Sequence, residues 1–258
     1  MAIMLHDAVV LKTICAKQKI AKVACFGVPE LCFSDKNFSL LINQNLEFAN
    51  LSDFWKCLGI DEVDYFDVNA NEGANIIVDL NVPINSKKYG NKYDLVLDYG
   101  VVQHVSCPFE LLANVNRLLK VGGTIIHSTY ANGFFDQGLF QVSPAFFYDN
   151  YVHSAGYECT FLSMSRIRSS KFFALKSIFK NLYHEAQERL SGRIAITGGF
   201  KKVGQLEKMT PGQHQIYSGF GLGYPQTSPI AFTETYLTYI RRAATLMIVK
   251  MAERLAND

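Results

Sequence analysis

The sequence has little net charge and no long apolar run. Its 25 Lys and Arg residues nearly balance its 23 Asp and Glu residues, which leaves a formal net charge of +2. A near-neutral chain offers no broad basic surface to a phosphate backbone, so nucleic acid is not the expected partner. The longest late apolar stretch, residues 243–249, lies between Arg242 and Lys250 and is too short to span a bilayer. We therefore expect no membrane span.

Paired cysteines and a targeting leader are also missing. The six Cys residues include no C-x-x-C pair, and several stand in apolar runs, where a reduced Cys behaves as a small hydrophobe. The N-terminal stretch has no basic leader before its apolar residues and carries His6 and Asp7 among them, unlike a signal peptide. These features predict a cytoplasmic protein with reduced cysteines, and we expect no metal site.

Strands and helices alternate along most of the chain, which predicts an α/β sheet. With 49% hydrophobic residues among 258, the chain can bury a large core in one enlarged domain or in one domain with a cap. A loop and a short helix are expected after residue 131, and a last amphipathic helix at 233–256. We assign a main domain to residues 1–204 and a C-terminal extension, a candidate substrate lid, to 205–258. The expected strands are 22–27, 62–68, 74–80, 93–99, 124–130, 157–165 and 192–203, with helices within 38–59, 108–123 and 170–190.

Acidic residues end two successive predicted strands. Asp67 follows the second strand, where a carboxylate can accept both hydroxyls of a ribose. Asp79 ends the third strand, where it could accept the exocyclic amine of an adenine while Leu80 packs on the ring. Taken alone, Asp67 is better explained as a turn residue or a helix cap, and the alternative for Asp79 is a turn acid ahead of Pro83. Together they predict a nucleoside site at the carboxyl edge of the sheet.

The order of these segments resembles the class I S-adenosylmethionine-dependent methyltransferases. The likeness covers roughly residues 22–151 and rests on "VDLNVP", "YDLVLDYGVVQHV" and "ANVNRLLKVGGTIIHSTYANGFF". More narrowly, these segments resemble bacterial enzymes of sugar, surface-polysaccharide and capsule biosynthesis. The resemblance implies a Rossmann-like fold: a mostly parallel, doubly wound sheet with an antiparallel closing strand and a C-terminal helical or loop extension. It also implies S-adenosylmethionine as cofactor and O-methylation of a small polar acceptor, a sugar or glycan precursor.

The same resemblance implies roles for individual residues at the cofactor. Gly27 would let the backbone approach the methionine half, although the family usually has Gly-x-Gly-x-Gly at this turn and here only one glycine matches. Asp98, Tyr99 and Gly100 would hold the α-ammonium group at the end of the fourth strand. Because the Glu-His pair of the family is Gln103-His104 here, a catalytically inactive partner subunit stays open as an alternative. An NAD enzyme is disfavoured because no Gly-x-Gly-x-x-Gly turn follows the first strand.

The acceptor site is expected between His104 and an aromatic loop. His104 is the candidate base for a hydroxyl acceptor, and its alternative is a histidine satisfied by the helix that follows. Several phenylalanines of the loop are expected to pack it onto the core, and a homo-oligomer stays open. The aromatic and amide side chains expected to roof the acceptor are Tyr130, Asn132, Gln137, Gln141 and Tyr148.

Overall fold

The computed structural model describes residues 2–166, 172–174, 192–205 and 209–212. Its main sheet has eight strands in the order β5-β4-β2-β6-β7-β10-β8-β9. From β5 to β7 neighbouring strands are parallel, whereas β10 is antiparallel to both β7 and β8. The strands are β2 (Lys22–Phe26), β4 (Glu62–Asp67), β5 (Ile76–Ile77), β6 (Tyr93–Asp98), β7 (Leu119–Asn132), β8 (Tyr157–Arg166), β9 (Phe172–Ala174) and β10 (Ile194–Lys202).

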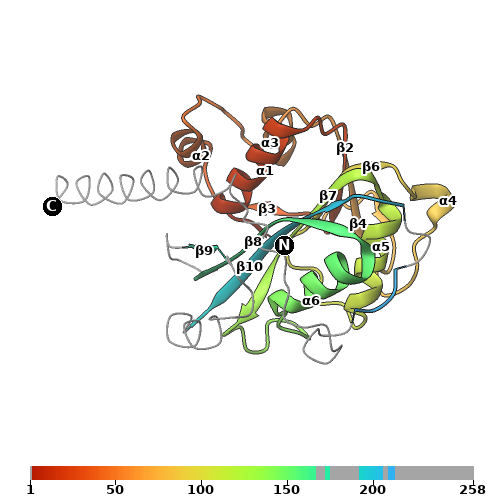
Figure 1. The fold of residues 1–258 in the computed structure, drawn as a ribbon. Coiled ribbons are helices and arrows are strands. Elements are labelled where there is room, and N and C mark those ends of the chain that lie inside the picture. Colours follow the sequence, from red (N-terminus) through yellow and green to blue (C-terminus); the bar gives the residue numbers. More distant parts are fainter. Residues whose placement is uncertain (1, 167–171, 175–191, 206–208, 213–258) are drawn as a thin grey trace.

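This topology confirms the predicted Rossmann-like α/β fold with an antiparallel closing strand. Helices cover both faces of the sheet (Figure 1). A second, two-stranded parallel sheet joins β1 (Ala2–Ile3) to β3 (Glu30–Leu31). The helices are α1 (Leu5–Lys17), α2 (Asp35–Ile42), α3 (Leu51–Cys57), α4 (Ser86–Tyr89), α5 (Pro108–Leu118), α6 (Pro144–Tyr148) and the π-helix η1 (Asp149–His153).

Alternation along β2 separates the two hydrophobic cores. Val23 and Cys25 pack with residues of α1, α2 and α3, whereas Ala24 and Phe26 pack with residues of α5 and α6. Successive side chains of a strand point to opposite faces, so a short strand buried on both sides reads as a continuous apolar run. Pro108 begins α5, and the helical spacing of its buried leucines confirms the helix predicted there.

Several predicted boundaries differ from the structure. The third strand is only Ile76–Ile77, and β7 begins at Leu119 rather than after the glycine pair. At that pair Gly122 has φ of 86°, and a Cβ on Gly123 would lie 3.2 Å from the Asp94 carbonyl oxygen. The pair therefore allows a close, irregular start of β7 beside β6 instead of ending the helix. The predicted helices at 170–190 and 233–256, and nearly all of the extension 205–258, lie outside the described residues.

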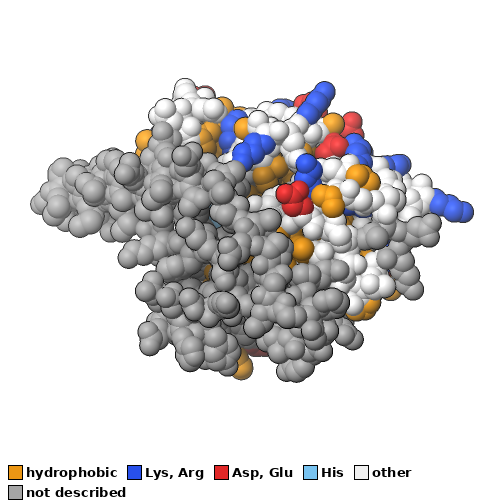
Figure 2. Space-filling view, in the orientation of Figure 1, with side chains coloured by type: hydrophobic (Ala, Val, Ile, Leu, Met, Phe, Trp, Pro, Cys, Tyr) orange, Lys and Arg blue, Asp and Glu red, His pale blue; other side chains and the backbone are white. Residues whose placement is uncertain are grey.

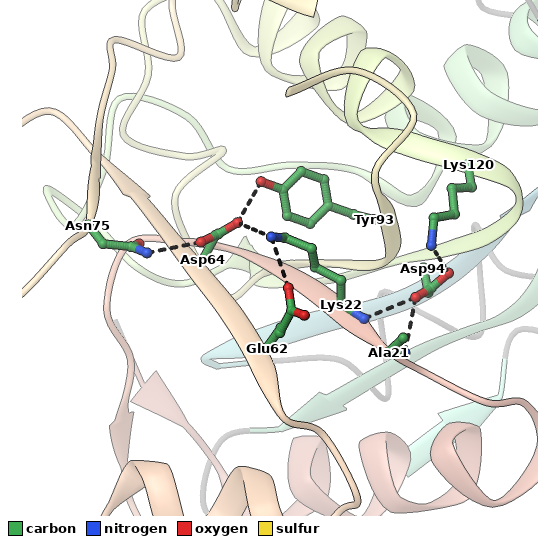
Figure 3. Close-up of polar contacts among 8 residues, drawn as sticks. All are labelled: Ala21, Lys22, Glu62, Asp64, Asn75, Tyr93, Asp94 and Lys120. Atoms are coloured by element: carbon green, nitrogen blue, oxygen red, sulfur yellow. Dashed lines mark hydrogen bonds and ion pairs between the residues drawn. The ribbon is translucent and has the colours of Figure 1, made fainter. Parts of the chain in front are cut away.

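Ion pairs join the strands at the amino edge of the sheet (Figure 3). Lys22 Nζ lies 3.1 Å from a carboxylate oxygen of Glu62 and 3.1 Å from one of Asp64. Lys120 Nζ lies 2.7 Å from Asp94, whose other oxygen accepts the backbone N–H groups of Ala21 and Lys22. The first residues of β2, β4 and β6 and the start of β7 are thereby tied together.

The described surface in Figure 2 carries basic and acidic side chains side by side. Among the described helices, none is long and apolar enough to cross a membrane.

Candidate functional site

A pocket of about 230 Å³ opens at the carboxyl edge of the sheet, opposite the ion pairs of Figure 3. We call it the strand-end pocket. Its walls come from the ends of β2, β4 and β5 and from the turn after β6. Five residues predicted from the sequence line it together: Gly27, Asp67, Asp79, Leu80 and His104. The other lining residues are Phe66, Val68, Val78, Asn81, Val101 and Val105.

Asp67 and Asp79 each use one carboxylate oxygen for the local turn. Asp67 Oδ1 accepts the backbone N–H of Val68 at 2.6 Å. Asp79 Oδ1 accepts the backbone and side-chain N–H groups of Asn81, both at 2.8 Å. Within the described residues the second oxygen of each acid accepts no hydrogen bond, and no Lys or Arg pairs with either. The turn contacts expected for these acids are present, and one oxygen of each remains without a partner among the described residues.

Backbone geometry shapes the two sides of the strand-end pocket. Gly27 has φ of 68°, a left-handed conformation that glycine adopts without steric cost, and its N–H donates to the Phe66 carbonyl at 2.7 Å. On the other side, the buried Asn114 of α5 donates to the carbonyls of Leu80 and Val82. Its side-chain oxygen also accepts the N–H of Ile84 at 3.0 Å. Asn114 thus fixes the segment after β5, including the apolar wall at Leu80.

Asp98 is committed to internal contacts, which corrects the prediction that its carboxylate holds a cofactor. Its Oδ1 accepts the N–H groups of Val101 and Val102 at 2.7 and 3.2 Å. Its Oδ2 lies 2.6 Å from His127 Nδ1, and His127 Nε2 lies 2.9 Å from the Tyr151 hydroxyl. All three side chains are fully buried or nearly so. Burial raises the pKa of the Tyr151 phenol well above its usual value, with Tyr157 and Asp98 adding to the effect.

With a neutral imidazole, the contacts among Asp98, His127 and Tyr151 allow one arrangement of protons. The carboxylate accepts from His127 Nδ1–H, so the unprotonated Nε2 accepts from the Tyr151 hydroxyl. Phe147 stacks on the imidazole with ring centroids 4.3 Å apart. With no opening to solvent, this group acts as an internal brace for the turn after β6. His127 is accordingly a core histidine.

Tyr99 and Gly100 also lie away from the strand-end pocket. The Tyr99 side chain is buried in the core formed with α1, α2 and α3, and its hydroxyl has no hydrogen-bond partner among the described residues. Burial, followed by the nearby Asp7, Cys25 and Cys15, raises the pKa of this phenol well above its usual value. Gly100 has φ of 96° and makes the turn between β6 and Val101. The predicted turn at Gly100 is present, and a role of its backbone at a ligand stays a prediction.

His104 lies on the pocket wall with its side chain exposed, but one ring nitrogen is already engaged. His104 Nε2 lies 3.2 Å from the side-chain nitrogen of Gln103. Gln103 is buried, and its side-chain oxygen accepts the Tyr130 backbone N–H at 3.1 Å and the Thr129 hydroxyl. Gln103, which stands where the resembled family has a glutamate, therefore links the turn after β6 to the end of β7.

The aromatic loop is anchored beside this turn, but its predicted contact residues do not line the strand-end pocket. Tyr130 stacks on Phe134 with centroids 3.7 Å apart. Gln141 accepts the Phe134 N–H at 3.3 Å, and Asn132 donates to the Gly192 carbonyl at 3.5 Å. Gln137 is exposed on the loop, whereas Tyr148 is buried in α6, where burial raises the pKa of its phenol.

The packing expected of Phe134, Phe140, Phe146 and Phe147 is confirmed for part of this set. Phe134 and Phe147 are buried, whereas Phe140 is 42% exposed. The backbone N–H groups of Leu139 and Phe140 both donate to the Gln103 carbonyl, which holds the loop against the turn after β6.

Sequence reasoning missed three residues that shape the site: Asn81, Asn114 and Gln103. Asn81 stands two residues after the predicted acid Asp79, a spacing typical of a side-chain turn. Asn114 interrupts the apolar face of a predicted helix, which is a usable signal for a buried amide with backbone partners. Gln103 is identified from the sequence only as the uncharged residue that replaces the glutamate of the family. Among the described residues no group of three or more His, Cys, Asp or Glu could hold a metal ion.

No family model and no curated protein matches the sequence. Solved structures with a similar fold include S-adenosylmethionine-dependent methyltransferases. One is the O-methyltransferase of a trans-AT PKS multienzyme of Brevibacillus brevis, in complex with S-adenosyl-L-homocysteine. It is 12% identical with a TM-score of 0.48, over 92% of this chain and 83% of that chain. Another, from Archaeoglobus fulgidus, is 15% identical with a TM-score of 0.42, over 76% and 94%. A third, from Mesorhizobium loti, is 11% identical with a TM-score of 0.42, over 74% and 95%. We rest the proposal below on the pocket rather than on these likenesses.

Proposed function

We propose that the protein is an S-adenosylmethionine-dependent methyltransferase and that the strand-end pocket holds the adenosine half of the cofactor. The observation that carries the proposal is the pair of acids at the end of β4 and just after β5, each with one oxygen left for a ligand. Asp67 accepts the ribose hydroxyls, and Asp79 accepts the adenine amine while Leu80 packs on the ring. Hydroxyl and amine groups are donors, so they match a site whose available side chains are acceptors.

The described residues fit the nucleoside end of S-adenosylmethionine better than its methionine end. The nucleoside end meets two carboxylates and the apolar walls Phe66, Leu80 and Val105. At the methionine end Gly27 provides a close backbone approach, but the Asp98 carboxylate is already bonded within the protein. Backbone groups of the turns after β2 and β6 therefore remain to hold the amino-acid part.

When bound, S-adenosylmethionine supplies a methyl group on a positively charged sulfonium. Because that leaving group is already activated, the protein mainly has to align the acceptor and exclude water. We place the acceptor beside His104 and below the loop that Gln103 anchors. We infer a small polar acceptor, with O-methylation of a sugar or glycan precursor as the preferred class.

The test is direct binding. The purified protein is examined by mass spectrometry for copurified S-adenosylhomocysteine and is then titrated calorimetrically with that compound. Binding with one site per chain is the expected result, and S-adenosylhomocysteine should compete with S-adenosylmethionine. A chain that binds neither compound would contradict the proposal and favour the inactive partner subunit.

A further inference from the structure

The orientation of the Gln103 amide is decided by its neighbours. Its side chain is 2% exposed and lies between the end of β7 and His104. A backbone N–H can only donate, so the Gln103 atom 3.1 Å from Tyr130 N has to be the oxygen. The Thr129 hydroxyl donates to the same oxygen. The NH₂ group consequently faces His104 Nε2, and rotating the amide would set two donors against each other at Tyr130.

This orientation determines the tautomer of His104. An amide NH₂ group only donates, so His104 Nε2 has to be the unprotonated, accepting nitrogen. A neutral imidazole carries one proton, which then resides on Nδ1. A glutamate at position 103 would do the opposite, because it would accept from Nε2–H and leave Nδ1 unprotonated. The neutral ring therefore has no lone pair available for the proton of an acceptor.

We propose that Gln103 makes His104 a fixed hydrogen-bond donor rather than a base, and that the acceptor is a carboxylate, as in a sugar acid. This inference rests on the function proposed above. His104 lines the strand-end pocket, so its Nδ1–H can hold one oxygen of an acceptor placed there. The remaining titratable side chains of that pocket, Asp67 and Asp79, serve the nucleoside.

The proton balance of methyl transfer separates a carboxylate from a neutral hydroxyl. A carboxylate oxygen forms the new O–C bond while the S–C bond breaks and its electron pair stays on sulfur. The sulfonium becomes a neutral thioether, the carboxylate becomes an ester, and no proton moves. A sugar hydroxyl that attacks the methyl group in the same way has to lose its proton, and the neutral His104 described here has no free nitrogen to take it.

The loop at residues 133–141 packs directly on the backbone of Gln103. Its Gly138 packs so closely that an added Cβ would lie 3.0 Å from the Gln103 carbonyl oxygen. That same oxygen accepts the N–H groups of Leu139 and Phe140 at 2.7 and 3.3 Å. Gln103 thus determines the tautomer of His104 through its side chain and holds the loop in position through its backbone carbonyl.

The tautomer can be measured without any methyl transfer. ¹⁵N NMR of the cofactor-free protein, at a pH where the ring is neutral, distinguishes protonated from unprotonated ring nitrogens, and the signals missing from a His104→Asn variant assign His104. We expect Nδ1–H in the parent and Nε2–H in Gln103→Glu, with melting temperatures compared as a control for folding. A parent ring protonated mainly on Nε2, the form that free imidazole side chains prefer in water, would overturn the inference even if S-adenosylhomocysteine binds.

The acceptor class is tested on the same resonances. The protein loaded with S-adenosylhomocysteine is titrated with glucuronate and, as a matched neutral probe, with glucose. Glucuronate should shift the His104 Nδ1 signal and glucose should not. An unmoved signal with glucuronate, or an equal shift with glucose, would overturn the carboxylate assignment. Failure of the proposed function would be seen separately, as a chain that cannot be loaded with S-adenosylhomocysteine.

Discussion

The acidic side chains at the two edges of the central sheet differ in how many of their carboxylate oxygens already have partners within the protein. At the amino edge, Asp64 and Asp94 each meet a lysine as well as hydrogen-bond donors (Figure 3). At the carboxyl edge, Asp67 and Asp79 meet no cation in the described part of the chain and keep one oxygen each. A carboxylate whose two oxygens both have partners within the protein stabilises the fold. A carboxylate in a pocket with one oxygen left unbonded is available to a ligand.

Asp98 is an exception to this difference, because it ends a strand at the carboxyl edge but both of its carboxylate oxygens have partners within the protein. Replacing it with Ala should destabilise the protein by about 3 to 5 kcal/mol, since His127 and two backbone N–H groups would lose a buried partner. Urea unfolding measures the change. Asp67→Ala is the matched control and should change the free energy of unfolding little. Similar losses in both variants would abolish the distinction between the two acids.

Lys202 is the buried cation of the amino edge and has no carboxylate partner in the described chain. Its Nζ donates to the carbonyls of Asn116 and Leu119 at 2.7 and 3.0 Å, near the end of α5. Burial lowers the pKa of this lysine from 10.5 to about 8. The unfolded chain therefore binds more protons than the folded one between these two pH values. Stability linked to this group should rise by about 3 kcal/mol from pH 8 to 10.5, following the width of the shift.

The measurement for Lys202 is the free energy of unfolding across this pH range. Lys202→Met, which keeps an unbranched side chain of similar length, should remove the rise, while Lys201→Met at a partly exposed neighbouring site should keep it. A parent whose stability is flat from pH 8 to 10.5 would show that the helix-end carbonyls fully compensate the buried charge.

Asp67→Asn and Asp79→Asn should weaken binding of S-adenosylhomocysteine by roughly tenfold to a hundredfold, the usual worth of a hydrogen bond to a charged group. Calorimetry measures both. For Asp79, the analogue with hypoxanthine in place of adenine lacks the amine, so parent and variant should bind it alike. Asp64→Asn, at the amino edge, is the control and should leave affinity unchanged. Parental affinity in either pocket variant would remove that acid from the site.

The smallest effect is expected at the ion pairs of the amino edge. Burial acts to raise the pKa of Asp64, but hydrogen bonds from Tyr93 and Asn75 and the Lys22 cation outweigh it, so the pKa is lowered. The resulting stabilisation is present above the usual pKa of 3.8 and is lost as the pH falls through the lowered value. Because Lys22 is partly exposed, Lys22→Met should cost about 1 kcal/mol or less at neutral pH. A larger loss by urea unfolding would mean that the pairs act as one network.

The grouping of Asp67, Asp79 and Leu80 at one pocket was predictable because its signals are local. Asp67, Asp79 and Leu80 each follow an apolar strand directly, and parallel strands bring their carboxyl ends to one edge. Asp98 was misassigned by the same rule, since its partner His127, and Tyr151 that bonds His127 in turn, lie 29 and 53 residues further along the chain and only folding brings them together. The helix α1 was missed because its apolar residues lack a clear helical period, whereas the leucines of α5 predicted that helix directly.

The position of β10 has a consequence for biogenesis. This strand comes last in the described sequence yet lies between β7 and β8. Until residues 194–202 leave the ribosome, β7 and β8 each keep one unpaired edge. The carbonyl of Asn116 near the end of α5 also lacks its hydrogen bond from Lys202, which follows it by 86 residues. The long separation predicts slow completion of the sheet. A nascent chain halted before β10 should therefore be the species that chaperones hold and that aggregates most readily.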